Sequence, residues 1–329
     1  MAKIIPAPDS FCFCTAVFGQ QYIQLAKLLA SDLLQFAPDH WFVVLTDAPS
    51  AFIDYPNVFA VKHWCRGVLP YNERRFAIQQ ALAIAPSTMY LDADVRICAP
   101  LPTTLQWQPG LTARSCGALQ KHLKEQFDRT SLEPDRLHKK WVIEQMFQKA
   151  GIDITEPNLK FINEFLFVVT ADDGREQEFL RLWGEMAVYA DTLGMHKHPT
   201  YAMAIAAFKS GLPVYRDEMV GLDFFDDRVE RVLIQEGKSS PDAKAEYFQQ
   251  QSRIEQQPSP LSQRLMRRVL RQSALIYNRA RVQLTAATMP SRLINYAVKE
   301  VKLPLASNSP GNSAANSAAN SAGDRLPIA

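Results

Sequence analysis

Short apolar runs alternate with helical stretches over the first ninety residues, and this alternation limits the fold more than any other feature. The apolar runs cover residues 11–18, 41–46 and 88–91. Between them, apolar side chains recur every three or four residues over 22–36 and 71–85, which is helical spacing. Because strands in this order are joined by crossover helices, the sequence predicts an α/β fold with a doubly wound, mainly parallel sheet.

Two carboxylates follow the third apolar run directly. Asp92 and Asp94 lie in the segment Met-Tyr-Leu-Asp-Ala-Asp-Val that begins at Met89. Ligands of doubly wound sheets bind at the carboxyl ends of the strands, and side chains two apart in extended chain point the same way. Hard oxygen ligands select Mg²⁺ or Mn²⁺. The segment therefore predicts a divalent metal site, although an Asp-x-Asp after a strand is also found as a solvated loop.

This segment resembles the Asp-x-Asp motif of the GT-A fold glycosyltransferases. Two further runs share that resemblance: Ala-Val-Phe-Gly-Gln-Gln-Tyr-Ile from Ala16 and Val-Val-Leu-Thr-Asp from Val43. The resemblance covers roughly residues 9–220. Within the GT-A fold enzymes, this part of the chain is distantly similar to the ABO blood-group transferase family. It implies a metal-dependent glycosyltransferase that moves a sugar from a nucleoside-diphosphate sugar to a hydroxyl of a saccharide or glycolipid acceptor.

The same resemblance implies roles for individual residues. Asp92 and Asp94 would hold the metal, and Glu164 would be a catalytic carboxylate near the reacting sugar. The positions that would contact the nucleotide or sugar donor are Thr15, Val17, Tyr22, Arg74 and Arg75. Ordinary core packing is the alternative for Tyr22, and an arginine at a helix start can also extend its charged end to water.

Later parts of the chain depart from the family pattern or leave its residues open. Where relatives have a small residue after Asn163, this chain has Glu164 and then Phe165, which we expect to narrow an acceptor pocket. His196 or His198 would contact the acceptor or the diphosphate, or would form a surface pair. A third metal ligand has five candidates without a distinguishing pattern: Asp217, Glu218, Asp223, Asp226 and Asp227.

The middle of the chain carries weaker signals. We expect irregular chain over 107–160 with a helix at 141–150, a strand at 161–169, and helices at 175–189 and 200–209. The second of these helices ends at Ser-Gly with a proline beyond, a common helix stop.

The C-terminal part differs in charge from the rest. Residues 261–329 contain ten Lys or Arg against two Asp or Glu, so the preceding part is acidic. We expect a glycosyltransferase domain at 1–250, a linker with a basic amphipathic helical segment at 251–305, and a disordered tail at 306–329. The linker is rich in Gln, Ser and Pro over 249–260. An acidic domain disfavours nucleic acid as a partner.

The basic segment over 261–303 fits an anionic membrane surface, or else a helix that packs on the catalytic domain. The apolar run after residue 10 is too short and wrongly flanked for a signal peptide. The five cysteines lack paired spacing and indicate reduced residues. We therefore expect a cytoplasmic protein, peripheral to the inner face of a membrane.

Two other functions compete with the transferase. In a haloacid-dehalogenase-type phosphatase, Asp92 would be the nucleophile and Asp94 the acid/base, with Thr170 and Lys209 following in order. Two strand-helix units precede the motif here, whereas that family usually begins with it. The non-enzymatic alternative is a membrane-associated binding protein that acts through its basic tail.

Overall fold

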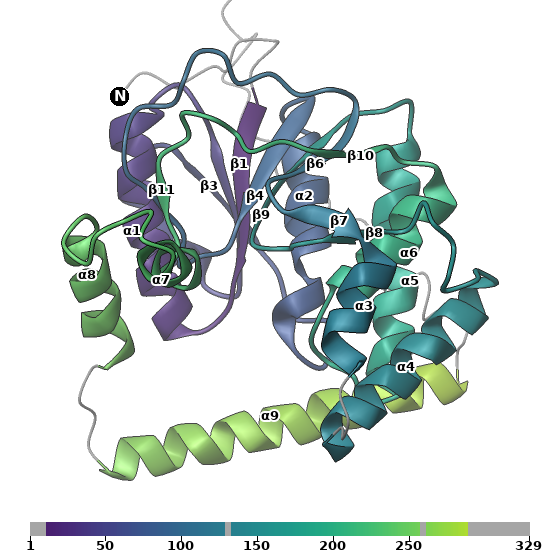
Figure 1. The fold of residues 1–329 in the computed structure, drawn as a ribbon. Coiled ribbons are helices and arrows are strands. Elements are labelled where there is room, and N and C mark those ends of the chain that lie inside the picture. The colour runs from purple at the N-terminus through teal and green to yellow at the C-terminus, as the bar shows by residue number, and fades with distance from the viewer. Residues whose placement is uncertain (1–10, 129–132, 257–260, 289–329) are drawn as a thin grey trace, which may run out of the picture. The chain divides into compact units, whose positions relative to one another are not determined.

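A mixed seven-stranded sheet forms the centre of the protein, in the order β10-β6-β9-β4-β1-β2-β3 (Figure 1). The computed structural model describes residues 11–128, 133–256 and 261–288. Strands β1 to β4 are parallel, and β9 runs antiparallel to both β4 and β6. The predicted doubly wound, mainly parallel α/β class is confirmed. The strands of this sheet are β1 (Phe11–Val17), β2 (Phe42–Thr46), β3 (Val58–Lys62), β4 (Ser87–Leu91), β6 (Gly110–Ala113), β9 (Leu166–Thr170) and β10 (Val214–Arg216).

Six α-helices lie between these strands in the described part of the chain up to Ser210. They are α1 (Gln20–Phe36), α2 (Arg74–Leu82), α3 (Leu119–Phe127), α4 (Pro134–Ala150), α5 (Arg175–Thr192) and α6 (Thr200–Ser210). Short 3-10 helices lie at η1 (Pro49–Phe52) and η2 (Pro70–Asn72). Helix α6 ends as expected, because Gly211 takes the left-handed conformation, with a φ of 67°.

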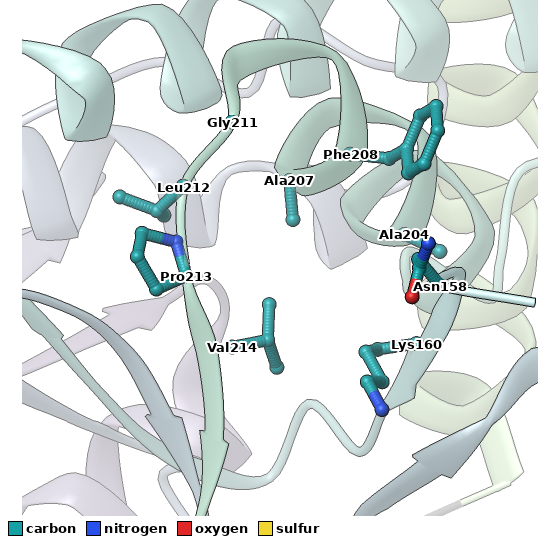
Figure 2. A pocket seen from close by; sticks show the side chains of 9 residues that line it. All are labelled: Asn158, Lys160, Ala204, Ala207, Phe208, Gly211, Leu212, Pro213 and Val214. Carbon is teal, nitrogen blue, oxygen red and sulfur yellow. The ribbon is translucent and has the colours of Figure 1, made fainter.

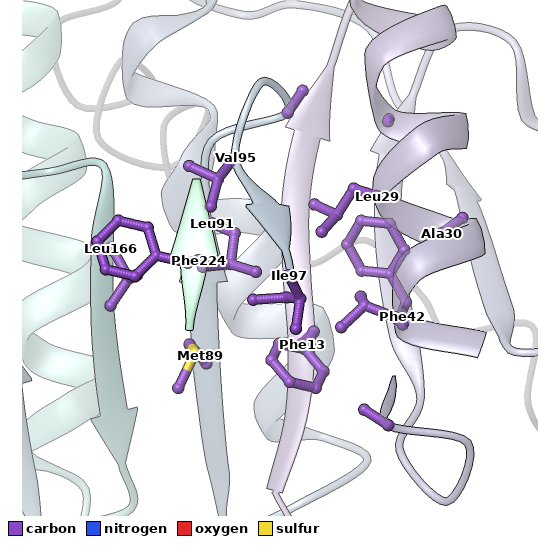
Figure 3. Packing of buried hydrophobic residues seen from close by; sticks show 14 of the residues in the cluster. Phe13, Leu29, Ala30, Phe42, Met89, Leu91, Val95, Ile97, Leu166 and Phe224 are labelled. Carbon is purple, nitrogen blue, oxygen red and sulfur yellow. The ribbon is translucent and has the colours of Figure 1, made fainter. Parts of the chain in front are cut away.

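Alternation along β1 explains how one strand serves both faces. Phe11 and Phe13 pack with Leu29 of α1 in one buried cluster, and Phe42 and Met89 join it from β2 and β4 (Figure 3). Cys12, between the two phenylalanines, points to the other face of the sheet, where its thiol donates to the Ala81 carbonyl of α2. A strand buried on both faces needs apolar side chains throughout, which is why this run is continuous in the sequence.

The region predicted as irregular contains regular structure, so that prediction was wrong in part. It forms β6, α3 and a small two-stranded sheet of β7 (Cys116–Ala118) with β8 (Lys160–Ile162). The expected helix is longer, as α4. Strands of three or four residues are too short to show a periodic pattern in the sequence. Whether such a segment forms a strand depends on its pairing with a neighbouring strand.

The strand expected at 161–169 is two strands that belong to different sheets. β8 pairs with β7, whereas β9 enters the main sheet beside β4. Between them the chain turns at Asn163-Glu-Phe, where the Asn163 N–H donates to the Ser115 carbonyl over 2.9 Å. The break in pairing therefore places Glu164 in a loop beside β4.

The C-terminal basic segment contains a long helix, as predicted, and two helices that were not predicted precede it. These helices are α7 (Asp227–Gln235), α8 (Ala245–Glu255) and the long α9 (Leu261–Thr288), and a third small sheet pairs β5 (Arg96–Ile97) with β11 (Phe224–Phe225). Residues 249–255, expected as linker, belong to α8, where Gln251 is buried and Gln250 accepts from Arg96 over 2.6 Å. The predicted disordered tail at 306–329 lies outside the described residues. Among the helices that are described, none has an apolar stretch long enough to cross a bilayer.

Candidate active site

Asp92 and Asp94 lie in a tight turn at the carboxyl end of β4. The Asp92 N–H donates to the Phe165 carbonyl over 3.0 Å, and the Asp92 carbonyl accepts from the Val95 N–H, also over 3.0 Å. Ala93 and Val95 are buried between and after the two carboxylates. The turn is therefore fixed from both sides, and both acidic side chains leave the same edge of the sheet.

Arg74 of α2 holds Asp92 in place. Its Nη2 donates to Asp92 Oδ1 over 2.8 Å, and its Nε donates to the Tyr90 hydroxyl over 3.1 Å. Tyr90 in turn donates to the same Asp92 oxygen over 3.3 Å. Burial alone would lower the pKa of Arg74, but Asp92, Tyr90 and Glu164 raise it. The remaining nitrogen, Nη1, is buried and has no hydrogen-bond partner.

Asp226 and Arg228 approach the two carboxylates from the start of α7. Asp226 caps this helix by accepting the N–H groups of Arg228 and Val229, each over 3.0 Å. The Arg228 guanidinium lies 3.1 Å from Asp226 and 3.7 Å from Asp92. Among the five predicted third ligands, Asp226 acts electrostatically on both Asp92 and Asp94.

The crowding of these carboxylates shifts their titration. Burial, then the charges of Asp92 and Asp226, raise the pKa of Asp94 to about 6. Burial also raises the pKa of Asp92, although Arg74 opposes it. Asp94 forms no ion pair in the part of the chain that the structure describes. Repulsion of this kind is relieved by a cation, so the donor set of Asp92 and Asp94 fits a divalent metal.

Asp92 and Asp94 supply two ligands for a metal ion, but the described residues do not supply a complete set of ligands. Within residues 11–128, 133–256 and 261–288, no three His, Cys, Asp or Glu side chains are grouped to hold a metal ion. Magnesium-type cations usually keep several other ligands, such as water and substrate phosphates, beside one or two carboxylates. The geometry therefore suits a metal shared with a phosphorylated substrate.

Glu164 lies beside this group. Its carboxylate is 3.8 Å from Arg74 Nη1, and its side chain is 24% exposed. Burial raises the pKa of Glu164, with Arg74 opposing. The carboxylate thus borders the Asp92 site and remains accessible from outside.

The residues expected at the nucleotide lie at the end of β1 and the start of α1. Tyr22 is half exposed, which argues against the core alternative, and its pKa is raised by burial and then by the charge of Asp94. Thr15 is fully buried, and its hydroxyl has no hydrogen-bond partner. Val17 is fully buried in the apolar cluster against α1, so it presents no surface to a ligand in this structure.

Several predicted residues are not brought to this group. Arg75 is buried, with its guanidinium over the Phe76 ring. The guanidinium also packs so closely on Gly184 of α5 that a side chain at Gly184 would place its Cβ 2.7 Å from Arg75 Nη1. Phe165 does not narrow a pocket as expected, because it is 5% exposed and packs in the core. His196 lies away from Asp92 and Asp94, since its ring contacts Asp191 over 2.8 Å and Arg279 of α9 over 3.2 Å.

The protein is similar in structure to solved structures of other proteins, two of which are described below. No protein-family model matches the chain, and neither does any curated protein. The apo structure of WbbM, a bifunctional glycosyltransferase, aligns at 11% identity with a TM-score of 0.39, covering 64% of this chain and 39% of WbbM. The galactosyltransferase LgtC, solved with donor and acceptor sugar analogues, aligns at 14% identity with a TM-score of 0.40, covering 73% of this chain and 83% of LgtC. This chain thus spans well under half of WbbM.

Two contributors to the site were missed in the sequence. Tyr90 could have been found, because it lies two residues before Asp92 in a strand and so points to the same face. Arg228 lies 136 residues after Asp92 and next to a helix cap, where no local pattern connects it to β4.

A separate pocket of about 270 Å³ lies between β8, the end of α6 and β10 (Figure 2). Asn158, Lys160 and Phe208 line it with Pro213 and Val214. None of the predicted donor or metal residues lines this pocket, so we do not assign it to the candidate active site.

Proposed function

We propose that the protein is a metal-dependent glycosyltransferase that uses a nucleoside-diphosphate sugar. The observation that carries the proposal is the pair of carboxylates after β4, with Asp92 held by Arg74 and Asp94 without an ion pair. A crowded carboxylate pair at the ligand-binding edge of an α/β sheet is suited to a divalent cation and a diphosphate. The acceptor we propose is a hydroxyl of a saccharide or glycolipid.

The residues of the chain divide the work by their positions. Arg74 and Tyr90 fix the orientation of Asp92. Arg74 Nη1 lies 3.8 Å from Glu164 but makes no hydrogen bond among the described residues, so it offers an N–H to a phosphate oxygen. Bound Mn²⁺ or Mg²⁺ would stabilise the negative charge that develops on the departing diphosphate. Glu164 borders the reacting sugar, and the half-exposed Tyr22 contacts the base or ribose near the end of β1.

The transfer reaction is tested by release of nucleoside diphosphate from a panel of UDP- and GDP-sugars with Mn²⁺ present. We expect one donor to be turned over, and Asp92→Asn to lower the rate at least about a hundredfold, as is usual when charge stabilisation is removed. Asp54→Asn, which changes an exposed carboxylate, is the matched control. Absence of turnover with every donor, combined with phosphate release from a phosphomonoester, would favour the phosphatase.

We also propose that α9 brings the enzyme to an anionic membrane surface on its cytoplasmic side. Within α9, Leu265, Met266, Val269 and Leu270 are each more than 60% exposed, and Arg268 and Arg271 are exposed beside them. The other half of α9 packs on the catalytic domain, where Arg281 donates to three carbonyls of residues 65–67. Basic residues near an anionic leaflet contribute about 1 kcal/mol each.

Vesicle sedimentation tests the membrane proposal. We expect the protein to pellet with vesicles of phosphatidylcholine and phosphatidylglycerol, and less with phosphatidylcholine alone. Leu265→Gln with Leu270→Gln should release it, whereas Ile53→Gln, at an exposed apolar residue outside α9, should not. Equal pelleting of both variants would remove the membrane proposal and leave the transferase intact.

A further inference from the structure

Basic side chains from three elements gather on the far side of the loop that carries Glu164. They are His122 of α3, Lys139 of α4 and His198, which precedes α6. Helix α4 packs on α6, and both α3 and α6 contact β8, the strand that leads into Glu164 (Figure 1). The Thr200 hydroxyl donates to the Ile162 carbonyl over 2.6 Å and ties the start of α6 to that strand. Segments distant in sequence thus border the candidate active site together.

The rings in this group fix the positions of its basic residues. His122 stacks on Phe161 with the ring centres 3.7 Å apart, and it lies 6.2 Å from the Tyr201 ring. Lys139 Nζ lies 5.2 Å from the centre of the same tyrosine ring. It also donates to Gln126 over 3.1 Å. Tyr201 therefore lies between a histidine and a lysine that come from different helices.

Carboxylates balance the positive charge of this group only in part, through Glu164 near Lys139 and Glu125 near His122. Burial and then Arg136 lower the pKa of Lys139, with Glu164 opposing, and burial and then Lys139 lower the pKa of His122. His198 is exposed, and partial desolvation followed by the charges of Lys139 and Lys197 lowers its pKa to about 4. None of the three side chains forms an ion pair with a carboxylate among the described residues. At neutral pH the imidazoles are thus uncharged hydrogen-bonding groups beside a lysine whose charge is only partly neutralised.

Tyr201 adds a second, independent observation. Its side chain is fully buried, and its hydroxyl has no hydrogen-bond partner among the residues that the structure describes. Burial and then the charge of Glu164 raise its pKa, so the hydroxyl keeps its proton and remains a donor. An unpaired buried hydroxyl costs about 1–3 kcal/mol, which a ligand oxygen at this position would offset.

We propose that Lys139, His122, His198 and Tyr201 form an acceptor subsite for a phosphate group. The proposal rests on the proposed transferase function for its role, because Glu164 borders both the subsite and Arg74. A neutral sugar would leave the charge of the lysine only partly balanced, whereas a phosphate monoester or diphosphate supplies negative charge and several acceptor oxygens. A sugar phosphate and a prenyl-linked phosphate both carry this group.

Direct binding tests the subsite without relying on turnover. We expect calorimetry in EDTA to show glucose 1-phosphate binding and no binding of glucose. Lys139→Gln and His198→Gln should each weaken it at least about tenfold, and Tyr201→Phe should weaken it less. Lys140→Gln, which removes an exposed lysine next in sequence, is the control and should bind as the wild type does. Citronellyl phosphate in place of glucose 1-phosphate separates the two sources, since the tighter ligand identifies the natural one.

The possible results separate this proposal from the proposed function. Failure of both phosphorylated probes to bind, or equal loss in the Lys140 variant, overturns the subsite whatever the protein does with nucleotides. If glucose 1-phosphate binds through Lys139 but no nucleoside diphosphate binds, the subsite stands and the transferase falls. Binding of both supports the two proposals together.

Discussion

Two carboxylates of the protein, the buried Glu73 next to Arg74 in sequence and the partly buried Asp94, have pKa values shifted in opposite directions. Glu73 is 1% exposed and accepts from His63 over 2.7 Å and from the N–H groups of Arg66 and Gly67 over 3.0 and 2.8 Å. Burial would raise its pKa, but His63 and these donors lower it.

At Asp94 the balance is reversed. Burial and neighbouring carboxylates raise its pKa to about 6, although Arg228 opposes the shift, and Asp94 has no ion pair within the described chain. A carboxylate completed by the fold stabilises the fold, whereas one left crowded and uncompensated is suited to a ligand. Glu73 and Asp94 illustrate this difference within one active-site region.

The largest expected effect is on stability, at the completed carboxylate. Glu73→Gln leaves the buried His63 without its charged partner and should lower the free energy of unfolding by about 3 kcal/mol. Urea denaturation followed by circular dichroism measures it. Asp94→Asn is the contrasting variant and should not destabilise the protein, because Asp94 has no ion-pair partner among the described residues. Equal losses in the two variants would erase the distinction between the carboxylate groups.

The next effect separates two adjacent arginines of α2. Arg74→Lys removes the fork that contacts Asp92 and Tyr90 together, and should weaken nucleotide binding with Mn²⁺ at least about tenfold. Burial lowers the pKa of Arg75 to about 9, and Glu73 opposes this shift. Arg75→Met should therefore leave nucleotide binding unchanged but lower stability, because it removes a positive charge that lowers the pKa of buried Glu73. A comparable loss of binding in the Arg75 variant would show that both arginines serve the ligand.

The affinity for Mn²⁺ should depend on pH because a proton competes with the metal at Asp94. Since the pKa of Asp94 is raised to about 6, the affinity should be constant above that value and fall about tenfold per pH unit below it. Electron paramagnetic resonance of free Mn²⁺ measures this dependence. Affinity that stays constant down to pH 4.5 would mean that Asp94 is not a ligand.

The smallest effect is a gain in stability at the uncompensated carboxylate. Without metal at pH 7, Asp94→Asn removes an ionised group whose folded-state pKa exceeds its unfolded value, so stability should rise by on the order of 1 kcal/mol. The gain should shrink between about pH 6 and pH 4, because Asp94 then becomes protonated in the wild type. Thermal unfolding across this range would contradict the account if Asp94→Asn destabilised the protein.

The sequence made the sheet and the carboxylate pair predictable because both depend on local patterns. Apolar strands buried on two faces and helices of nine or more residues have clear periodicity, and Asp92 and Asp94 follow such a strand directly. Arg74 was also accessible to this reasoning, since an arginine at the start of an otherwise apolar helix requires a polar partner.

The rest depends on contacts between distant segments. Nothing local distinguishes Glu73, whose partners come from a loop, from an ordinary glutamate before a helix. Phe165 was expected in a pocket because its neighbours resemble acceptor-site residues, but the turn between β8 and β9 directs it into the core. Arg228 and Tyr201 join the site only when α7 and α6 pack beside β4 and β8.

The measurement that tests the central claim most directly is calorimetric titration of UDP and GDP into the wild type, with and without Mn²⁺, repeated on Asp92→Asn and Asp94→Asn. The account predicts that one nucleotide binds only with Mn²⁺ and that both variants lose this binding while remaining folded. Absence of binding by either nucleotide, or equal binding without Mn²⁺ and in both variants, would contradict a metal and diphosphate site at the end of β4.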